Sequence, residues 1–138
     1  MPPKISFARI EIPTSPVLDA SALVRGLLEP EHPAQRHFRD ALAPELALVE
    51  VAQALKNYVR AGLLNRERAD MALAGLLALP LRLRPLDELV AGAFEASLAF
   101  EISAYDACYL VLAEQAGAVL VTADRRLAAL ATRSELVA

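Results

Sequence analysis

The sequence is poor in several residues that define common classes of protein. Its 138 residues include one cysteine, Cys108, which excludes an intrachain disulfide framework and a cysteine-rich zinc site. The five glycines are scattered, so no glycine-rich phosphate-binding loop is present. The longest uncharged stretch near the middle of the chain, 71–81, has 11 residues, whereas a membrane-spanning helix needs about 20. Residues 1–12 lack the apolar core of a secretory signal. We therefore expect a cytoplasmic protein that makes no membrane contact.

The composition is that of one globular domain. Hydrophobic residues make up 56% of the chain and charged residues 22%, which excludes a disordered protein. A chain of this length buries enough surface to build a core without covalent staples. The net charge is 14 − 17 = −3. This balance argues against indiscriminate binding to nucleic acid, which normally relies on a basic surface.

Basic residues are missing from one long stretch of the chain. Between Arg84 and Arg125 there are forty residues without a lysine or arginine. The seven acids in that stretch are Asp87, Glu88, Glu95, Glu101, Asp106, Glu114 and Asp124. Exposed helix faces account for Glu95, Glu101 and Glu114. Asp106 and Asp124 need another explanation.

The pattern of apolar residues predicts alternating short strands and helices. We interpret residues 1–15 as a proline-rich lead-in with a short strand near 5–12, and residues 16–138 as the domain. The expected strands are 16–18, a short one near 42, 81–84, 118–122 and 135–137. The expected helices are 21–29, 33–42, 46–61, 66–79, 87–100 with Asp87 as its cap, 104–115 and 125–131. This alternation predicts a three-layer α/β/α sandwich with a central parallel sheet.

In such a fold, ligands bind near the carboxyl ends of the strands. Four acids are candidates for a site there. Asp19 ends the first strand and Asp124 follows the strand 118–122 by two residues. Asp106 lies in the first turn of an apolar helix. Glu50 lies in mid-helix with no opposite charge three or four residues away, and its helical face continues with small polar residues.

Two explanations of these acids stay open at this point. Asp19 and Asp124 are good N-caps, Asp106 in a first turn suits the helix dipole, and Glu50 is compatible with a solvated face. As a group, however, four carboxylates without a basic partner repel one another. A divalent cation removes that repulsion. Mg²⁺ and Mn²⁺ prefer hard oxygen ligands, and the absence of histidine and cysteine disfavours zinc. Carboxylate-bound ions of this kind cleave phosphodiesters.

Four segments carry a resemblance to a known family. These are Val17–Leu23 (VLDASAL), Ala43–Val51 (APELALVEV), Tyr105–Ala113 (YDACYLVLA) and Leu120–Asp124 (LVTAD). Together they resemble, in order and spacing, the signature blocks of PIN-domain proteins, and in particular the VapC toxins of prokaryotic toxin–antitoxin pairs. Each block alone is weak, whereas four in order are strongly specific. The resemblance covers residues 16 to about 137. A lead-in of about 15 residues departs from the pattern, because these toxins usually begin almost at the first strand.

The resemblance implies an α/β/α fold and a Mg²⁺- or Mn²⁺-dependent endoribonuclease. It matches Asp19, Glu50, Asp106 and Asp124 to the four metal-binding, catalytic acids, and Thr122 to a small hydroxyl residue beside the last of them. It also implies RNA as substrate, a homodimer, and a cognate antitoxin whose peptide enters the acidic groove. The alternative is a catalytically inactive partner-binding domain whose acids only cap helices.

Other residues and folds are less informative. A receiver domain needs a late lysine, but the last lysine here is Lys56. A haloacid-dehalogenase-like phosphatase needs a second aspartate where this chain has Ser21. We expect Cys108 in the core, Tyr105 and Tyr109 in the core or at its rim, and His32 and His37 at the surface. The basic residues that form a candidate groove rim for RNA phosphates are Lys56, Arg60, Arg125 and Arg126.

Overall fold

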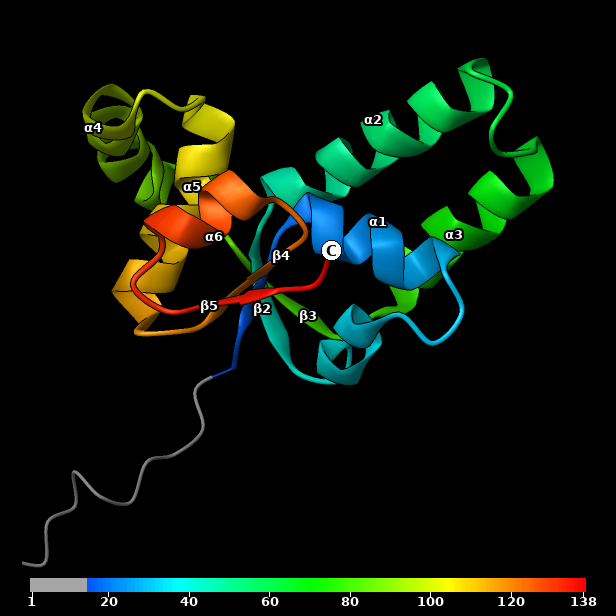
Figure 1. Cartoon of the computed structure of the whole chain (residues 1–138), viewed down its shortest axis with the longest axis horizontal. Helices are drawn as coiled ribbons and strands as arrows, with labels where there is room; N and C mark the ends of the chain where they lie inside the picture. Colours follow the sequence, from blue (N-terminus) through cyan, green and yellow to red (C-terminus); the bar gives the residue numbers. More distant parts are fainter. Residues whose placement is uncertain (1–14) are drawn as a thin grey trace, which may run out of the picture.

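The computed structural model describes residues 15–138 (Figure 1). The short strand expected over 5–12 lies outside the described residues. The strands in chain order are β1 (Val17–Leu18), β2 (Ala41–Pro44), β3 (Leu81–Arg84), β4 (Leu120–Thr122) and β5 (Ser134–Leu136). They form one 5-stranded parallel sheet in the order β3-β2-β1-β4-β5. The predicted parallel α/β architecture is confirmed.

Helices connect all of these strands. They are α1 (Ala20–Leu28), the 3₁₀ helix η2 (Pro33–His37), α2 (Leu46–Arg60), α3 (Arg66–Ala78), the 3₁₀ helix η3 (Leu86–Glu88), α4 (Val90–Phe100), α5 (Ala104–Ala116) and α6 (Arg125–Leu130). Crossovers between parallel strands are right-handed. The connections from β1 and β2 step one way along the sheet and those from β3 and β4 step the other way. The two groups of helices therefore cover opposite faces.

The strand order reverses between β1 and β4, at the centre of the sheet. Their register pairs Val17 with Leu120 and Leu18 with Val121, and the Asp19 amide donates to the Val121 carbonyl over 3.1 Å. In open parallel sheets, ligands bind outside the carboxyl ends of strands at such a reversal. The fold thus places the residues after β1 and after β4 side by side at that edge.

The helices differ in how much of their surface is buried. In α5, which packs on β1, β2 and β4, six residues are buried between Ala107 and Ala113, as expected for a helix that is apolar on nearly all sides. Cys108 is 8% exposed and Tyr109 is 1% exposed, which confirms their predicted core positions. In contrast, α2 and α3 form a hairpin that extends away from the sheet (Figure 1).

Several sequence predictions about local structure were wrong, among them that for Tyr105, which was expected in the core or at its rim and is 62% exposed. The helix expected over 33–42 is only the short 3₁₀ helix η2, whereas the short strand expected near residue 42 is confirmed as β2, in which residues 41–44 pair in register with residues 81–84 of β3. Asp87 does not cap a helix, since it lies in η3 and α4 begins only at Val90. His32 is not at the surface: it is 7% exposed and its Nδ1 accepts a hydrogen bond of 3.2 Å from the Ala34 amide.

No single helix among residues 15–138 has both the length and the apolar character needed to cross a membrane. Only α4 and α5 taken as a pair pass that test, and they are bent by 111° where they meet.

Candidate active site

Asp19 is the most deeply placed of the four predicted acids. It follows β1, caps α1 and is 4% exposed. Its Oδ1 accepts hydrogen bonds from the Ser21 hydroxyl at 2.7 Å and from the Ala22 amide at 2.9 Å. Its Oδ2 accepts a hydrogen bond of 2.5 Å from the Thr122 hydroxyl. The capping role expected for this residue is therefore confirmed, and a network of hydroxyls holds its carboxylate in place.

Thr122 and Ser21 join the ends of β1 and β4. The Thr122 hydroxyl oxygen accepts a 2.9 Å hydrogen bond from the Asp124 amide, and the Ser21 hydroxyl oxygen accepts one of the same length from the Ala123 amide. The bond between Ser21 and Ala123, like the bond between Thr122 and Asp19, connects residues about one hundred positions apart in the chain. These bonds determine how the loop that carries Asp124 sits relative to Asp19. Asp124 itself is exposed and caps α6 by accepting from the Arg126 and Leu127 amides.

We expect the Thr122→Val variant to lose about 1.5–3 kcal/mol of unfolding free energy, the usual worth of a hydrogen bond to a charged group. Valine fills the same space but cannot donate to Asp19. Urea denaturation measures the loss. The matched control is Thr132→Val, because Thr132 donates to Glu114 over 2.7 Å at an exposed position. That variant should change stability by less than about 1 kcal/mol, and equal losses in the two variants contradict a special role for Thr122.

Glu50 and Asp106 reach the same region from helices. Glu50 lies in the middle of α2, half-buried, and its Oε1 accepts a 2.6 Å hydrogen bond from the Tyr109 hydroxyl. Asp106 lies half-buried in the first turn of α5, behind the N-cap Ser103. The predicted first-turn position of Asp106 is confirmed.

The pKa values of these acids are shifted by burial and by the charges of the other acids. Burial raises the pKa of Asp19 above its usual range against its three hydrogen bonds, and the charge of Asp106 raises it further. Burial also raises the pKa of Glu50, as do the charges of Asp106 and Asp19, while the Tyr109 hydrogen bond opposes the shift. Burial and the charge of Asp124 raise the pKa of Asp106, against the Ser103 hydrogen bond and the charge of Arg126. Asp106 thus interacts electrostatically with each of the other three acids.

The four acids have no ion-pair partner within residues 15–138. In that same part of the chain, no three His, Cys, Asp or Glu side chains stand close enough together to form a ready-made metal centre. The side chains therefore share an electrostatic environment without converging on one point. Their chemistry, hard carboxylate oxygens in mutual repulsion, suits Mg²⁺ or Mn²⁺, which retain several water ligands and often take only one or two carboxylates directly.

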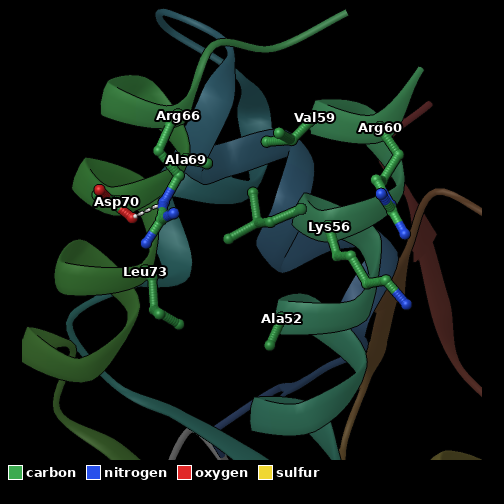
Figure 2. A pocket seen from close by; sticks show the side chains of 9 residues that line it. Ala52, Lys56, Val59, Arg60, Arg66, Ala69, Asp70 and Leu73 are labelled. Carbon is green, nitrogen blue, oxygen red and sulfur yellow. Dashed lines mark hydrogen bonds and ion pairs between the residues drawn. The ribbon is translucent and has the colours of Figure 1, made fainter. Parts of the chain in front are cut away.

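The expected basic rim is only partly free. The Arg126 guanidinium donates to the carbonyls of Glu101 at 2.9 Å and Phe100 at 3.3 Å, so it fixes the turn between α4 and α5. Lys56 and Arg60 lie on α2 beside a cavity of about 310 Å³ between α2 and α3 (Figure 2). None of the four acids lines that cavity.

His37, expected at the surface, is partly buried and pairs with Glu135 of β5 at 2.6 Å.

The arrangement has known counterparts. The PIN domain family model matches residues 17–132, which is most of the chain and includes all four acids. The chain belongs to the PIN domain family. This PIN domain is similar to Ribonuclease VapC3 of Mycobacterium tuberculosis, with 39% identity over 125 residues that cover 84% of this chain and 90% of that protein. Ribonuclease VapC3 of Pyrobaculum aerophilum is 34% identical over 119 residues, covering 81% of this chain and 91% of that protein.

A solved structure agrees with this membership. The crystal structure of PAE2754 from Pyrobaculum aerophilum superposes on this PIN domain with a TM-score of 0.73 and 27% sequence identity. The match covers 91% of this chain and 92% of that one.

Of the hydroxyl groups in this PIN domain, the sequence points to that of Thr122 but assigns no site role to those of Ser21 and Tyr109. Both make hydrogen bonds to predicted acids. The signal that could have found Tyr109 is its position three residues after Asp106, which puts the two on neighbouring positions of one helix.

Proposed function

We propose that this chain is a Mg²⁺- or Mn²⁺-dependent endoribonuclease and the toxin of a VapBC-type toxin–antitoxin pair. The observation that carries the proposal is the placement of Asp19 and Asp124 after β1 and β4, where the strand order reverses. Glu50 and Asp106 interact electrostatically with this pair. Within the described residues, none of the four acids has an ion-pair partner. The names of the VapC3 relatives support RNA as the substrate.

The residues would divide the work as follows. Asp19, Glu50, Asp106 and Asp124 hold the cation directly or through water. When bound, Mg²⁺ or Mn²⁺ lowers the pKa of an attacking water and stabilises the charge that develops on the phosphodiester oxygens. A carboxylate of this set that contacts the water rather than the ion would accept the proton that the water releases. Ser21 and Thr122 keep Asp19 oriented.

Cleavage of a defined RNA by the purified protein tests this function. We expect cleavage with Mg²⁺ or Mn²⁺ and none after EDTA, with activity restored when Mn²⁺ is returned in excess. Single-stranded DNA of the same sequence is the substrate control. Cleavage that persists in EDTA contradicts the metal role, and a folded protein that cuts no RNA supports the alternative in which the acids only cap helices.

The partner proposals rest on separate observations. A homodimer is supported by Val90, Phe94 and Leu98, spaced four residues apart on α4 and each 59–64% exposed. Sedimentation that gives only the 14.8 kDa monomer at micromolar concentration contradicts it. An antitoxin partner is supported by the VapC names of the relatives. A small gene directly upstream that encodes a DNA-binding N-terminus is the genomic observation expected for that partner.

A further inference from the structure

Tyr109 carries a hydroxyl group at a core position that the ring of a phenylalanine could fill without one. The residue is 1% exposed and lies in the core on α5. A hydroxyl buried at such a position destabilises the fold unless it has hydrogen-bond partners. This hydroxyl donates to Glu50 Oε1 of α2 at 2.6 Å. One hydrogen bond therefore links α5 to α2.

The acceptor of this hydroxyl belongs to the candidate site. The charge of Asp19, the most buried acid, also acts on the Tyr109 phenol and helps to raise its pKa. Glu50 has a long flexible side chain that is repelled by Asp106 and Asp19. Without an anchor, that repulsion favours rotation of the carboxylate toward solvent. The Tyr109 hydrogen bond opposes this rotation and occupies only one of the two carboxylate oxygens.

Helix α5 thus contributes to the site twice. It carries Asp106 in its first turn, and three residues later it carries the anchor of Glu50. Direct chemistry by Tyr109 is disfavoured, because burial and the neighbouring carboxylates raise the pKa of its phenol far above the neutral range. Its ring packs in the core, and the hydrogen bond to Glu50 accounts for its hydroxyl.

We infer that Tyr109 is a positioning residue whose hydroxyl holds the Glu50 carboxylate on the side of Asp19 and Asp106, where these acids can hold one cation directly or through its water ligands. This inference rests on the proposed function. Residues that hydrogen-bond to metal ligands commonly change metal affinity by about 10–100-fold when they are replaced. A residue that only fills the core changes thermal stability without a specific effect on the cation.

Isothermal titration of Mn²⁺ into the full-length, metal-free protein tests the inference without an activity assay. We expect Tyr109→Phe to raise the Mn²⁺ dissociation constant about 10–100-fold while the far-UV circular dichroism spectrum stays unchanged. Tyr105→Phe is the control on the same helix, since Tyr105 is 62% exposed, and it should bind Mn²⁺ as the wild type does. In a Glu50→Ala background, adding Tyr109→Phe should change the constant by less than about twofold, because the two residues act as one unit.

The outcomes separate the inference from the function on which it rests. Wild-type protein that binds no Mn²⁺ overturns the proposed metal-dependent function and the inference with it. Wild-type binding that Tyr109→Phe leaves unchanged overturns the inference alone. An equal loss of affinity on adding Tyr109→Phe with and without Glu50 also overturns it, because Tyr109 then acts through the fold in general.

Discussion

Replacing Asp106 with asparagine is expected to reduce RNA cleavage by at least about 10³-fold, since the ion and its bound water contribute several kcal/mol to the transition state and each 1.4 kcal/mol is about tenfold in rate. Asp106 is the most informative acid to replace. It interacts with the other three carboxylates, and Ser103, not Asp106, caps α5. Initial rates on a defined RNA in saturating Mn²⁺ measure the loss.

The same substitution should stabilise the metal-free protein at neutral pH. The folded state raises the pKa of Asp106 by burial and by the charge of Asp124. Between the ordinary carboxyl pKa of about 4 and the raised value, the folded state therefore binds more protons than the unfolded state, and the unfolding free energy falls as pH increases. Asparagine removes this group, so urea unfolding of Asp106→Asn between pH 4 and pH 7 should show a shallower fall.

Glu95→Gln is the matched control for Asp106→Asn. Glu95 is an exposed acid on α4, and its replacement also removes one negative charge. It should leave cleavage within about twofold of wild type, because no ligand of the site is touched. A folded Asp106→Asn protein that keeps a tenth or more of the wild-type rate contradicts the assignment of Asp106 to the site.

Adding Mn²⁺ should raise the melting temperature of the wild-type protein by roughly 8 °C. A ligand present at one hundred times its dissociation constant stabilises the folded state by about 2.7 kcal/mol when it binds only that state. For a domain of this size, each kcal/mol corresponds to roughly 3 °C. Burial first, and then mutual repulsion, raises the pKa values of Asp19, Glu50 and Asp106, and a bound cation would favour their charged forms. Differential scanning calorimetry with and without EDTA measures the gain in melting temperature.

This measurement separates the two explanations of the acids. Asp106→Asn should lose most of the Mn²⁺-dependent gain, whereas Glu95→Gln should keep all of it. A protein whose acids only cap helices shows no gain in any variant. Asp19 and Asp124 do cap α1 and α6, so the absence of a gain would leave capping as their sufficient role.

Much of the fold followed from local sequence patterns. The spacing of apolar residues predicted α2 and α5 to within one residue at each end. Helix formation depends on residues a few positions apart, and α5 ends at Gly117, a residue type that commonly terminates helices. The helix predicted over residues 33–42 was the main failure, because it ends at His37 and its last residues belong to β2, whose presence near residue 42 was predicted. Residues 41–44 become extended through pairing with residues 81–84, about forty positions away, and no local pattern contains that partner.

The candidate site shows the same division. The sequence by itself determined which carboxylates stand at strand ends and in helices without a local counter-charge, since those features depend on adjacent residues. Only the tertiary structure decided which groups meet: Thr122 with Asp19 across 103 positions and Tyr109 with Glu50 across 59. It also decided that the four acids interact without three of them converging on one point. Such contacts depend on the strand order and on the right-handed crossovers between strands. The periodicity of a helix or strand specifies which face a side chain lies on, but not which distant residue it will contact.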